Sequence, residues 1–178
     1  MAAALVTGVG VGLWELARPI LIDAETVAAA PRAQLIAYGA LQVVKTVGFL
    51  AGLYGFYLCA TLRGPVVKVF MALAVAGGVF FSAVWVWVAI SARFTVIYVL
   101  GGMWYQMIAP VALGVAAFFA RRAARWKALV FVVVGVLNMQ IFSLLGPGRA
   151  SVVQGIIWTA LGYAVYTCQR AARDSSNA

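Results

Sequence analysis

The sequence contains no histidine, only two cysteines and only four acidic residues among its 178 positions. Histidine is the commonest general base and the commonest metal ligand in proteins, so its absence removes the usual candidate for both roles. Cys59 and Cys168 do not form a CxxC pair, and two thiolates alone cannot complete a tetrahedral zinc site. We therefore expect no metal site, and we interpret both cysteines as small apolar residues near helix ends.

The sequence motifs of the common enzyme classes are also missing. The chain has no HExxH, GxSxG, GxxxxGK[ST] or GxGxxG pattern. The glycines of Gly8-Val9-Gly10-Val11-Gly12 follow no strand and lie inside an apolar run, so they indicate helix packing and not a phosphate-binding loop. The sequence therefore assigns no cofactor and no recognisable route to ATP hydrolysis.

Apolar residues, by contrast, dominate the composition. They make up 66% of the chain, charged residues make up 10%, and the mean hydropathy is +1.05. Soluble domains are about 45–50% apolar and about 25% charged, and a chain this short keeps a large fraction of its surface exposed. Lipid must therefore be the solvent for much of that surface. We predict an all-α fold, a polytopic transmembrane helix bundle.

Five apolar runs are long enough to cross a bilayer, which takes about 20 helical residues. They span residues 34–60, 66–91, 95–119, 128–146 and 152–168. Glycine, proline and arginine separate the runs, and these residues stop helices or favour water and headgroups. We predict a single domain over residues 1–170, followed by a short polar cytoplasmic tail at 171–178.

An earlier apolar run, residues 2–22, admits two interpretations. A signal peptide would fit the small residues Ala28-Ala29-Ala30, which resemble a cleavage site. The run lacks a basic n-region, however, and Glu15 and Arg18 interrupt its apolar core. We therefore predict a sixth transmembrane helix here. Six helices also allow two halves of three in opposite orientations, an arrangement that is common in transporters.

The distribution of lysine and arginine predicts the orientation of the bundle. With six spans, eight basic residues fall on one side, namely Arg63, Lys68, Arg121, Arg122, Arg125, Lys127, Arg170 and Arg173. The other side receives three, Arg32, Arg93 and Arg149. The positive-inside rule then places both termini in the cytoplasm, in a multi-pass protein of the plasma or inner membrane. The basic residues form no stripe of recognition residues, so the net charge of +9 does not predict nucleic-acid binding.

Two opposite charges are predicted near the middle of the bilayer. At ~1.5 Å per residue, Glu15 lies roughly 18 Å from the cytoplasmic edge of a ~30 Å apolar core, and Lys45 lies roughly 15 Å from the outer edge. A lone charge at this depth costs roughly 2.5–3.5 kcal/mol on insertion scales, so we predict that the two side chains pair. The pair would serve either helix packing or a function, as part of a substrate pocket or a proton relay, and the sequence does not decide between them.

Small residues share the helix faces of both charges. They are Ala4, Gly8 and Gly12 in the first helix, and Gly48, Gly52 and Gly55 in the second. Such faces let helix backbones approach closely in lipid, where the hydrophobic driving force between helices is absent.

Other polar and aromatic residues are predicted at a similar depth. The full set of candidate substrate-binding residues is Glu15, Arg18, Gln42, Lys45, Trp104, Gln106, Asn138 and Trp158. For Gln106 and Asn138 we favour interhelical hydrogen bonding, because neutral polar groups in transmembrane helices commonly serve packing. Trp85 and Trp87 lie nearer the outer end of their helix, where we expect them to join an aromatic belt.

Three functions fit these observations, and we favour a small-molecule binding or transport protein whose polar site lies near mid-membrane. Its expected partners are the lipid bilayer and a hydrophobic or small anionic ligand. In size and helix count the chain resembles the substrate-binding components of energy-coupling-factor vitamin importers, which implies that a partner or an ion gradient would supply the energy.

The first alternative is an accessory subunit of a membrane complex, with a membrane-protein partner or a second copy of the chain. The second is a membrane-embedded isomerase or cyclase acting on a hydrophobic substrate, in which Glu15 would donate or accept the proton.

Overall fold

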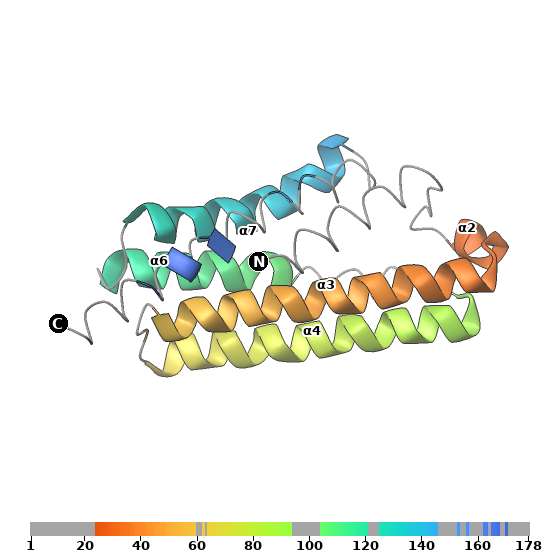
Figure 1. Ribbon diagram of the computed structural model, residues 1–178, viewed down its shortest axis with the longest axis horizontal. Coiled ribbons are helices and arrows are strands. Elements are labelled where there is room, and N and C mark those ends of the chain that lie inside the picture. The colour runs from red at the N-terminus through yellow and green to blue at the C-terminus, as the bar shows by residue number, and fades with distance from the viewer. Residues whose placement is uncertain are drawn as a thin grey trace.

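The structure is a computed structural model, which describes residues 24–59, 62, 64–93, 104–120 and 125–145, and positions 153, 156, 162, 163, 165–167 and 170. All regular secondary structure in these ranges is helical, which confirms the predicted all-α class (Figure 1). The elements are α2 (Ala24–Ala29), α3 (Arg32–Cys59), α4 (Pro65–Ser91), η1 (Trp104–Ile108), α6 (Ala109–Ala120) and α7 (Arg125–Leu145).

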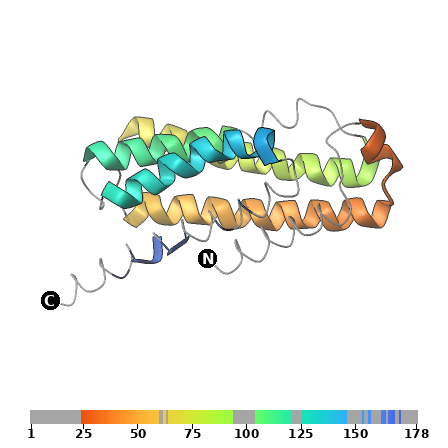
Figure 2. The ribbon, with the colours of Figure 1, turned by 90° about the horizontal axis from the view of Figure 1, so that it is seen from above.

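Helices α3 and α4 form a long antiparallel pair (Figure 1), and the view from above shows them closest where α3 begins and α4 ends (Figure 2). The segments Arg32–Leu58 and Pro65–Ser91, 27 residues each, are long and apolar enough to cross a membrane. Helix α4 begins with Pro65 directly after Gly64, whose φ of 139° strains any residue with a Cβ. Proline suits this first position because its missing N–H would have had no partner inside the helix.

Helices α6 and α7 form a second antiparallel pair, whose backbones meet through two glycines. A Cβ placed on Gly114 would lie 2.7 Å from the carbonyl oxygen of Ala128. A Cβ placed on Gly135 would lie 2.6 Å from the carbonyl oxygen of Met107. Only a residue without a Cβ permits so close an approach, which is the small-residue packing found between transmembrane helices.

Ahead of α6 the chain forms the π-helical turn η1, where the sequence predicts a regular helix through residues 95–119. Pro110 explains the difference, because it has no N–H to donate to the carbonyl of Gln106 and its ring crowds that carbonyl. The wider π turn accommodates this interruption within an otherwise helical segment. The structure describes this segment from Trp104 onward.

The core of the described chain consists of two apolar clusters at opposite ends of the α3–α4 pair. The Phe56 cluster joins both helix pairs, and the rings of Phe56 and Phe131 stack across α3 and α7 with centroids 3.8 Å apart. It comprises Phe49, Leu53, Phe56, Leu62, Met71, Ala74, Ala109, Leu113, Ala117, Ala128, Phe131, Val134 and Val165. The Trp85 cluster closes the other end and comprises Val27, Leu35, Tyr38, Val84, Trp85 and Val88.

The Trp85 cluster corrects one prediction and adds one element. Trp85 is only 7% exposed and packs edge-on against Tyr38, with ring centroids 4.8 Å apart, so it is a core residue and not part of an aromatic belt. Trp87, two residues later, points to the other side of α4 and is 52% exposed. The short helix α2, which the sequence analysis did not predict, is held to this cluster by the buried side chain of Val27.

Two predicted segments, the first helix at 2–22 and the tail at 171–178, lie outside the described residues. The described positions of the predicted helix at 152–168 are helical, and Val165 belongs to the Phe56 cluster. The predicted helix at 152–168 therefore contributes at least Val165 to the core.

Candidate functional site: a buried polar layer in the middle of α3

Helix α3 presents one continuous buried face, and its polar residues lie at the middle of that face. Positions at spacings of three and four are buried along the whole helix, as expected for one side of an α-helix. They are Leu35, Tyr38, Gln42, Lys45, Phe49, Leu53 and Phe56. Gln42, Lys45 and the adjacent Thr46 are 4%, 2% and 1% exposed, and together they form what we call the polar layer.

The polar layer separates the two apolar clusters. Leu35 and Tyr38 on one side belong to the Trp85 cluster, and Phe49 and Leu53 on the other belong to the Phe56 cluster. Lys45 lies 13 residues from Arg32 and 14 from Cys59, so about 20 Å of helix extends on either side of it. In a helix that crosses a bilayer, this position falls near the middle of the hydrocarbon core.

The hydrogen bonding of the layer is incomplete within the described residues. The Thr46 hydroxyl donates to the backbone carbonyl of Gln42 over 2.9 Å, which satisfies it within its own helix. The side-chain oxygen of Gln42, Oε1, is fully buried and accepts no hydrogen bond there. An unsatisfied buried acceptor of this kind costs about 1–3 kcal/mol, so the site calls for a hydrogen-bond donor.

Helix α4 closes the side of the layer next to Thr46. A Cβ on Gly78 would lie 3.2 Å from Cγ2 of Thr46 and 2.6 Å from Cδ1 of Leu50. The absence of a side chain at Gly78 therefore lets α4 lie directly against the polar layer. A ligand has no room between Gly78 and Thr46, so it must approach from another side of α3.

The predicted site residues have different outcomes. Lys45 and Gln42 are buried on one face of α3, as the depth argument expects for interior residues. Gln106 is also buried, at 8% exposure, but it lies in η1, an element that contacts α4, α6 and α7. Trp104 and Asn138 belong to η1 and α7, and their side chains lie outside the description. Glu15, Arg18 and Trp158 lie outside the described residues, so the Glu15–Lys45 pair stays a prediction.

Sequence reasoning missed three residues that shape this part of the molecule. Thr46 joins the polar layer, and its position beside Lys45 in an apolar run was a usable signal. Pro110 sets the π turn that carries Gln106, and a proline inside an apolar run is a recognised sign of an irregular helix. Gly78 had no such signal, because only the position of α4 against Thr46 gives it a role.

The described residues offer no group of three His, Cys, Asp or Glu side chains that could hold a metal ion. Within this range the polar layer provides one amide, one hydroxyl and one ammonium group, whose chemistry is hydrogen bonding and, for the ammonium, positive charge. Comparisons with known proteins gave no match among protein families, curated proteins or solved structures.

Proposed function

We propose that this chain is a multi-pass integral membrane protein of six helices, with both termini in the cytoplasm, that binds a small molecule at the polar layer of α3 as part of its transport. The observation that carries the proposal is the burial of Gln42 and Lys45 at the centre of a 28-residue, mostly apolar helix. Polar groups at that depth are costly, and in membrane proteins they commonly mark substrate or ion pathways.

The outer surface of the helices supports a membrane setting. Helix α4 exposes apolar side chains along its entire length, from Val66 at 64% exposure to Ile90 at 62%. The exposed set on this helix is Val66, Val69, Leu73, Val75, Val79, Phe80, Val86, Trp87 and Ile90. Monomeric soluble proteins rarely expose a contiguous apolar patch that extends along a whole helix of this length. Lipid would cover this surface without cost.

The chemistry of the polar layer indicates the class of ligand. The Oε1 atom of Gln42 accepts hydrogen bonds only, so it requires a donor on the ligand. Lys45 contributes a positive charge on the same face of α3, one turn away. A small molecule with an N–H or O–H donor would satisfy Oε1 of Gln42, and the charge of Lys45 would attract an acidic group on that molecule.

Native mass spectrometry of the protein extracted gently from its own membrane tests this proposal. We expect a discrete small-molecule adduct that survives transfer into the gas phase and is lost in Lys45→Met and Gln42→Leu. Lys68→Met is the matched control, because it removes the same charge from an exposed position. The control should retain the adduct at the wild-type level.

Other results would support the alternative functions. Recovery of the chain with a second protein in fixed stoichiometry, and without an adduct, would identify an accessory subunit. Turnover of an added isoprenoid or lipid that is abolished by Glu15→Gln would identify an enzyme. Retention of the adduct in both Lys45→Met and Gln42→Leu would contradict the assignment of the site to the polar layer.

A further inference from the structure

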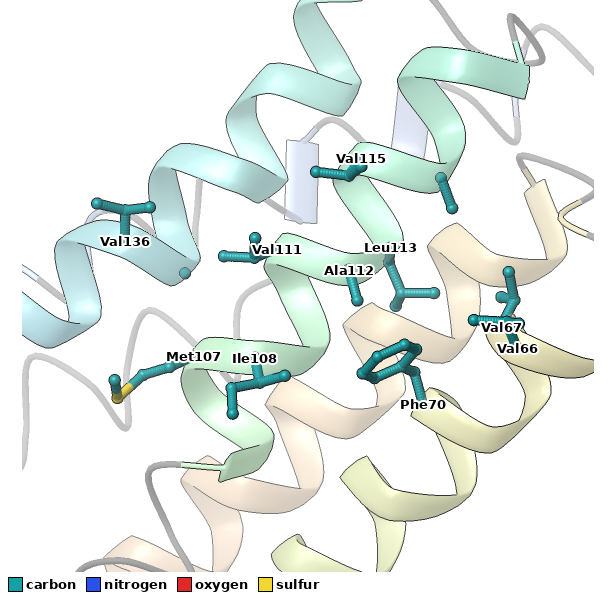
Figure 3. Close-up of a pocket in the computed structure, with 12 residues that line it drawn as sticks. Val66, Val67, Phe70, Met107, Ile108, Val111, Ala112, Leu113, Val115 and Val136 are labelled. Atoms are coloured by element: carbon teal, nitrogen blue, oxygen red, sulfur yellow. The ribbon is translucent and has the colours of Figure 1, made fainter.

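A second candidate site lies in a groove that α4, η1, α6 and α7 form together (Figure 3). Its volume is 610 Å³, and every residue that lines it is apolar. Ile108 of η1 and Val111, Ala112 and Val115 of α6 form the middle of the groove, while α4 contributes Val66 and Phe70 and α7 contributes Val136. The groove extends from Met107 in η1 to Ala116 in α6, which is about 13 Å along the helix axis.

The groove is separate from the polar layer. On α4 its lining reaches Phe70, whereas the polar layer meets α4 at Gly78. Eight helical residues between these positions correspond to about 12 Å along the axis. A ligand in the groove would therefore contact neither Gln42 nor Lys45. The residues in and beside the groove alone would select that ligand.

The contacts of the two glycines fix which residues of α6 and α7 lie at the same level. Gly114 meets Ala128 and Val132, so its level on α7 is Val130. Because the helices are antiparallel, moving five residues along α6 to Phe119 moves five residues back along α7 to Arg125. Measured along the helix axis, Arg125 thus lies about 4.5 Å beyond the level of Ala116, where the groove ends.

The end of the groove beside Arg125 carries positive charge. Arg125 begins α7 with an exposed side chain, and Lys127 follows in the same turn with its ammonium 5.6 Å from the ring centroid of Trp126. The first turn of α7 contains no acidic residue. Lys127 itself is only 9% exposed. A helix start already carries about half a positive charge from the helix dipole, so this start and the exposed side chain of Arg125 together attract an anion. Lys68 adds an exposed cation near the start of α4.

We propose that this groove binds one anionic phospholipid, with an acyl chain along α6 and the phosphate at Arg125. The apolar lining suits a hydrocarbon chain, because its side chains provide no hydrogen-bonding group for a polar chain. The cationic start of α7 suits the headgroup. Arg125 belongs to the end of the bundle that the positive-inside rule places at the cytoplasmic surface, where anionic lipids are concentrated. Trp126, 48% exposed, would lie at the headgroup level that tryptophan prefers.

This lipid site rests on the proposed membrane setting, and the experiment distinguishes a failure of the lipid site from a failure of that setting. The purified full-length protein is incubated with an equimolar mixture of dioleoyl phosphatidylglycerol and dioleoyl phosphatidylcholine, and retained lipids are identified by native mass spectrometry. We expect one phosphatidylglycerol per chain, retained about fivefold over phosphatidylcholine, which is the preference that one basic residue at a membrane surface provides.

Two variants test the two parts of the site. Ala112→Phe fills the groove and should reduce phosphatidylglycerol retention, while Arg125→Gln should equalise the two lipids without filling the groove. The matched controls are Ala76→Phe, on the exposed face of α4, and Arg93→Gln, at an exposed arginine just after the C-terminal end of α4. Both controls, and Lys45→Met at the polar layer, should keep the wild-type preference.

Each contrary result has a definite meaning. Equal retention of both lipids by the wild-type protein would overturn the proposal, as would an unchanged preference in Arg125→Gln. A stable dimer that excludes phosphatidylglycerol would show that a second copy covers the groove. If the protein also fails to insert into vesicles of these lipids, the membrane setting and the proposed function fail with it. If it inserts but shows no preference, only the lipid site is refuted.

Discussion

The close helix contacts predict that the same glycine-to-alanine substitution destabilises the protein between α6 and α7 but is nearly neutral between α3 and α4. An added methyl group at Gly114 would lie 2.7 Å from the carbonyl oxygen of Ala128, and at Gly135 it would lie 2.6 Å from the carbonyl oxygen of Met107. Both obstacles are backbone oxygens, one in α7 and the other in η1, so no change of rotamer relieves them. The same methyl group at Gly78 would meet Cδ1 of Leu50, the flexible end of a side chain.

The magnitudes follow from two opposing terms. Replacing glycine by alanine inside a helix gains about 0.5–1 kcal/mol in backbone entropy, whatever the surroundings. Forcing extra volume into a packed contact costs about 1–3 kcal/mol when the backbone has to move. We therefore expect Gly114→Ala and Gly135→Ala each to destabilise the protein by about 1–2 kcal/mol. For Gly78→Ala the rotation of Leu50 avoids most of the cost, and we expect a change within about 0.5 kcal/mol of zero.

The assay is unfolding in mixed detergent micelles, followed by tryptophan fluorescence and repeated with helical circular dichroism. Gly78→Ala is the control for Gly114→Ala, because it adds the same atom to a helix interior at a buried glycine. Equal destabilisation of all three variants would refute the reasoning, since it would show that adding any methyl group between helices matters more than what it meets. Neutral behaviour of Gly114→Ala would show that α6 and α7 do not approach so closely.

Three further predictions concern the core and the two buried cations. Phe56→Ala and Phe131→Ala should each cost about 3–5 kcal/mol in the same assay, and the double variant should cost less than their sum because the two rings stack on each other. Lys45→Met and Glu15→Gln should each lower stability, and if their pairing is structural the double variant should regain it. Lys127, which precedes the apolar run 128–146, has its pKa lowered by burial. The folded state therefore binds this proton less tightly than the unfolded state, so stability should rise with pH between the lowered pKa and the ordinary value of 10.5, and Lys127→Met should flatten that rise.

Part of the candidate site follows from the sequence pattern, and the rest depends on contacts between helices. The sequence predicts the interior location of Gln42 and Lys45, because the insertion cost of a charge or amide in an apolar run requires it to avoid lipid. It could not predict that Thr46 completes the layer or that Gly78 closes one side, since both roles depend on the position of α4. The pairing of Lys45 with Glu15 remains a prediction of the depth argument alone.

The tryptophans show why helical periodicity falls short when every residue of a helix is apolar. Trp85 and Trp87 both have apolar neighbours in the sequence, and from the sequence both are predicted to join an aromatic belt. The structure buries Trp85 against Tyr38 and leaves Trp87 exposed. In a soluble protein, polar residues on the outer face would have distinguished the two sides of this helix. In α4 the exposed face is apolar as well, so that contrast is missing.

The sequence by itself determined the all-α class, the approximate limits of α3, α4 and α7, and the buried location of the polar residues in α3. These properties follow from local chemistry, since helix formation, helix ends at glycine and proline, and the cost of burying charge are all set within a few residues. Only the tertiary structure decided which glycines bring helices together, which tryptophan is buried, and where α4, α6 and α7 leave an apolar groove. Those properties depend on which faces of separate helices meet, and close packing selects them through the shapes of side chains far apart in the chain.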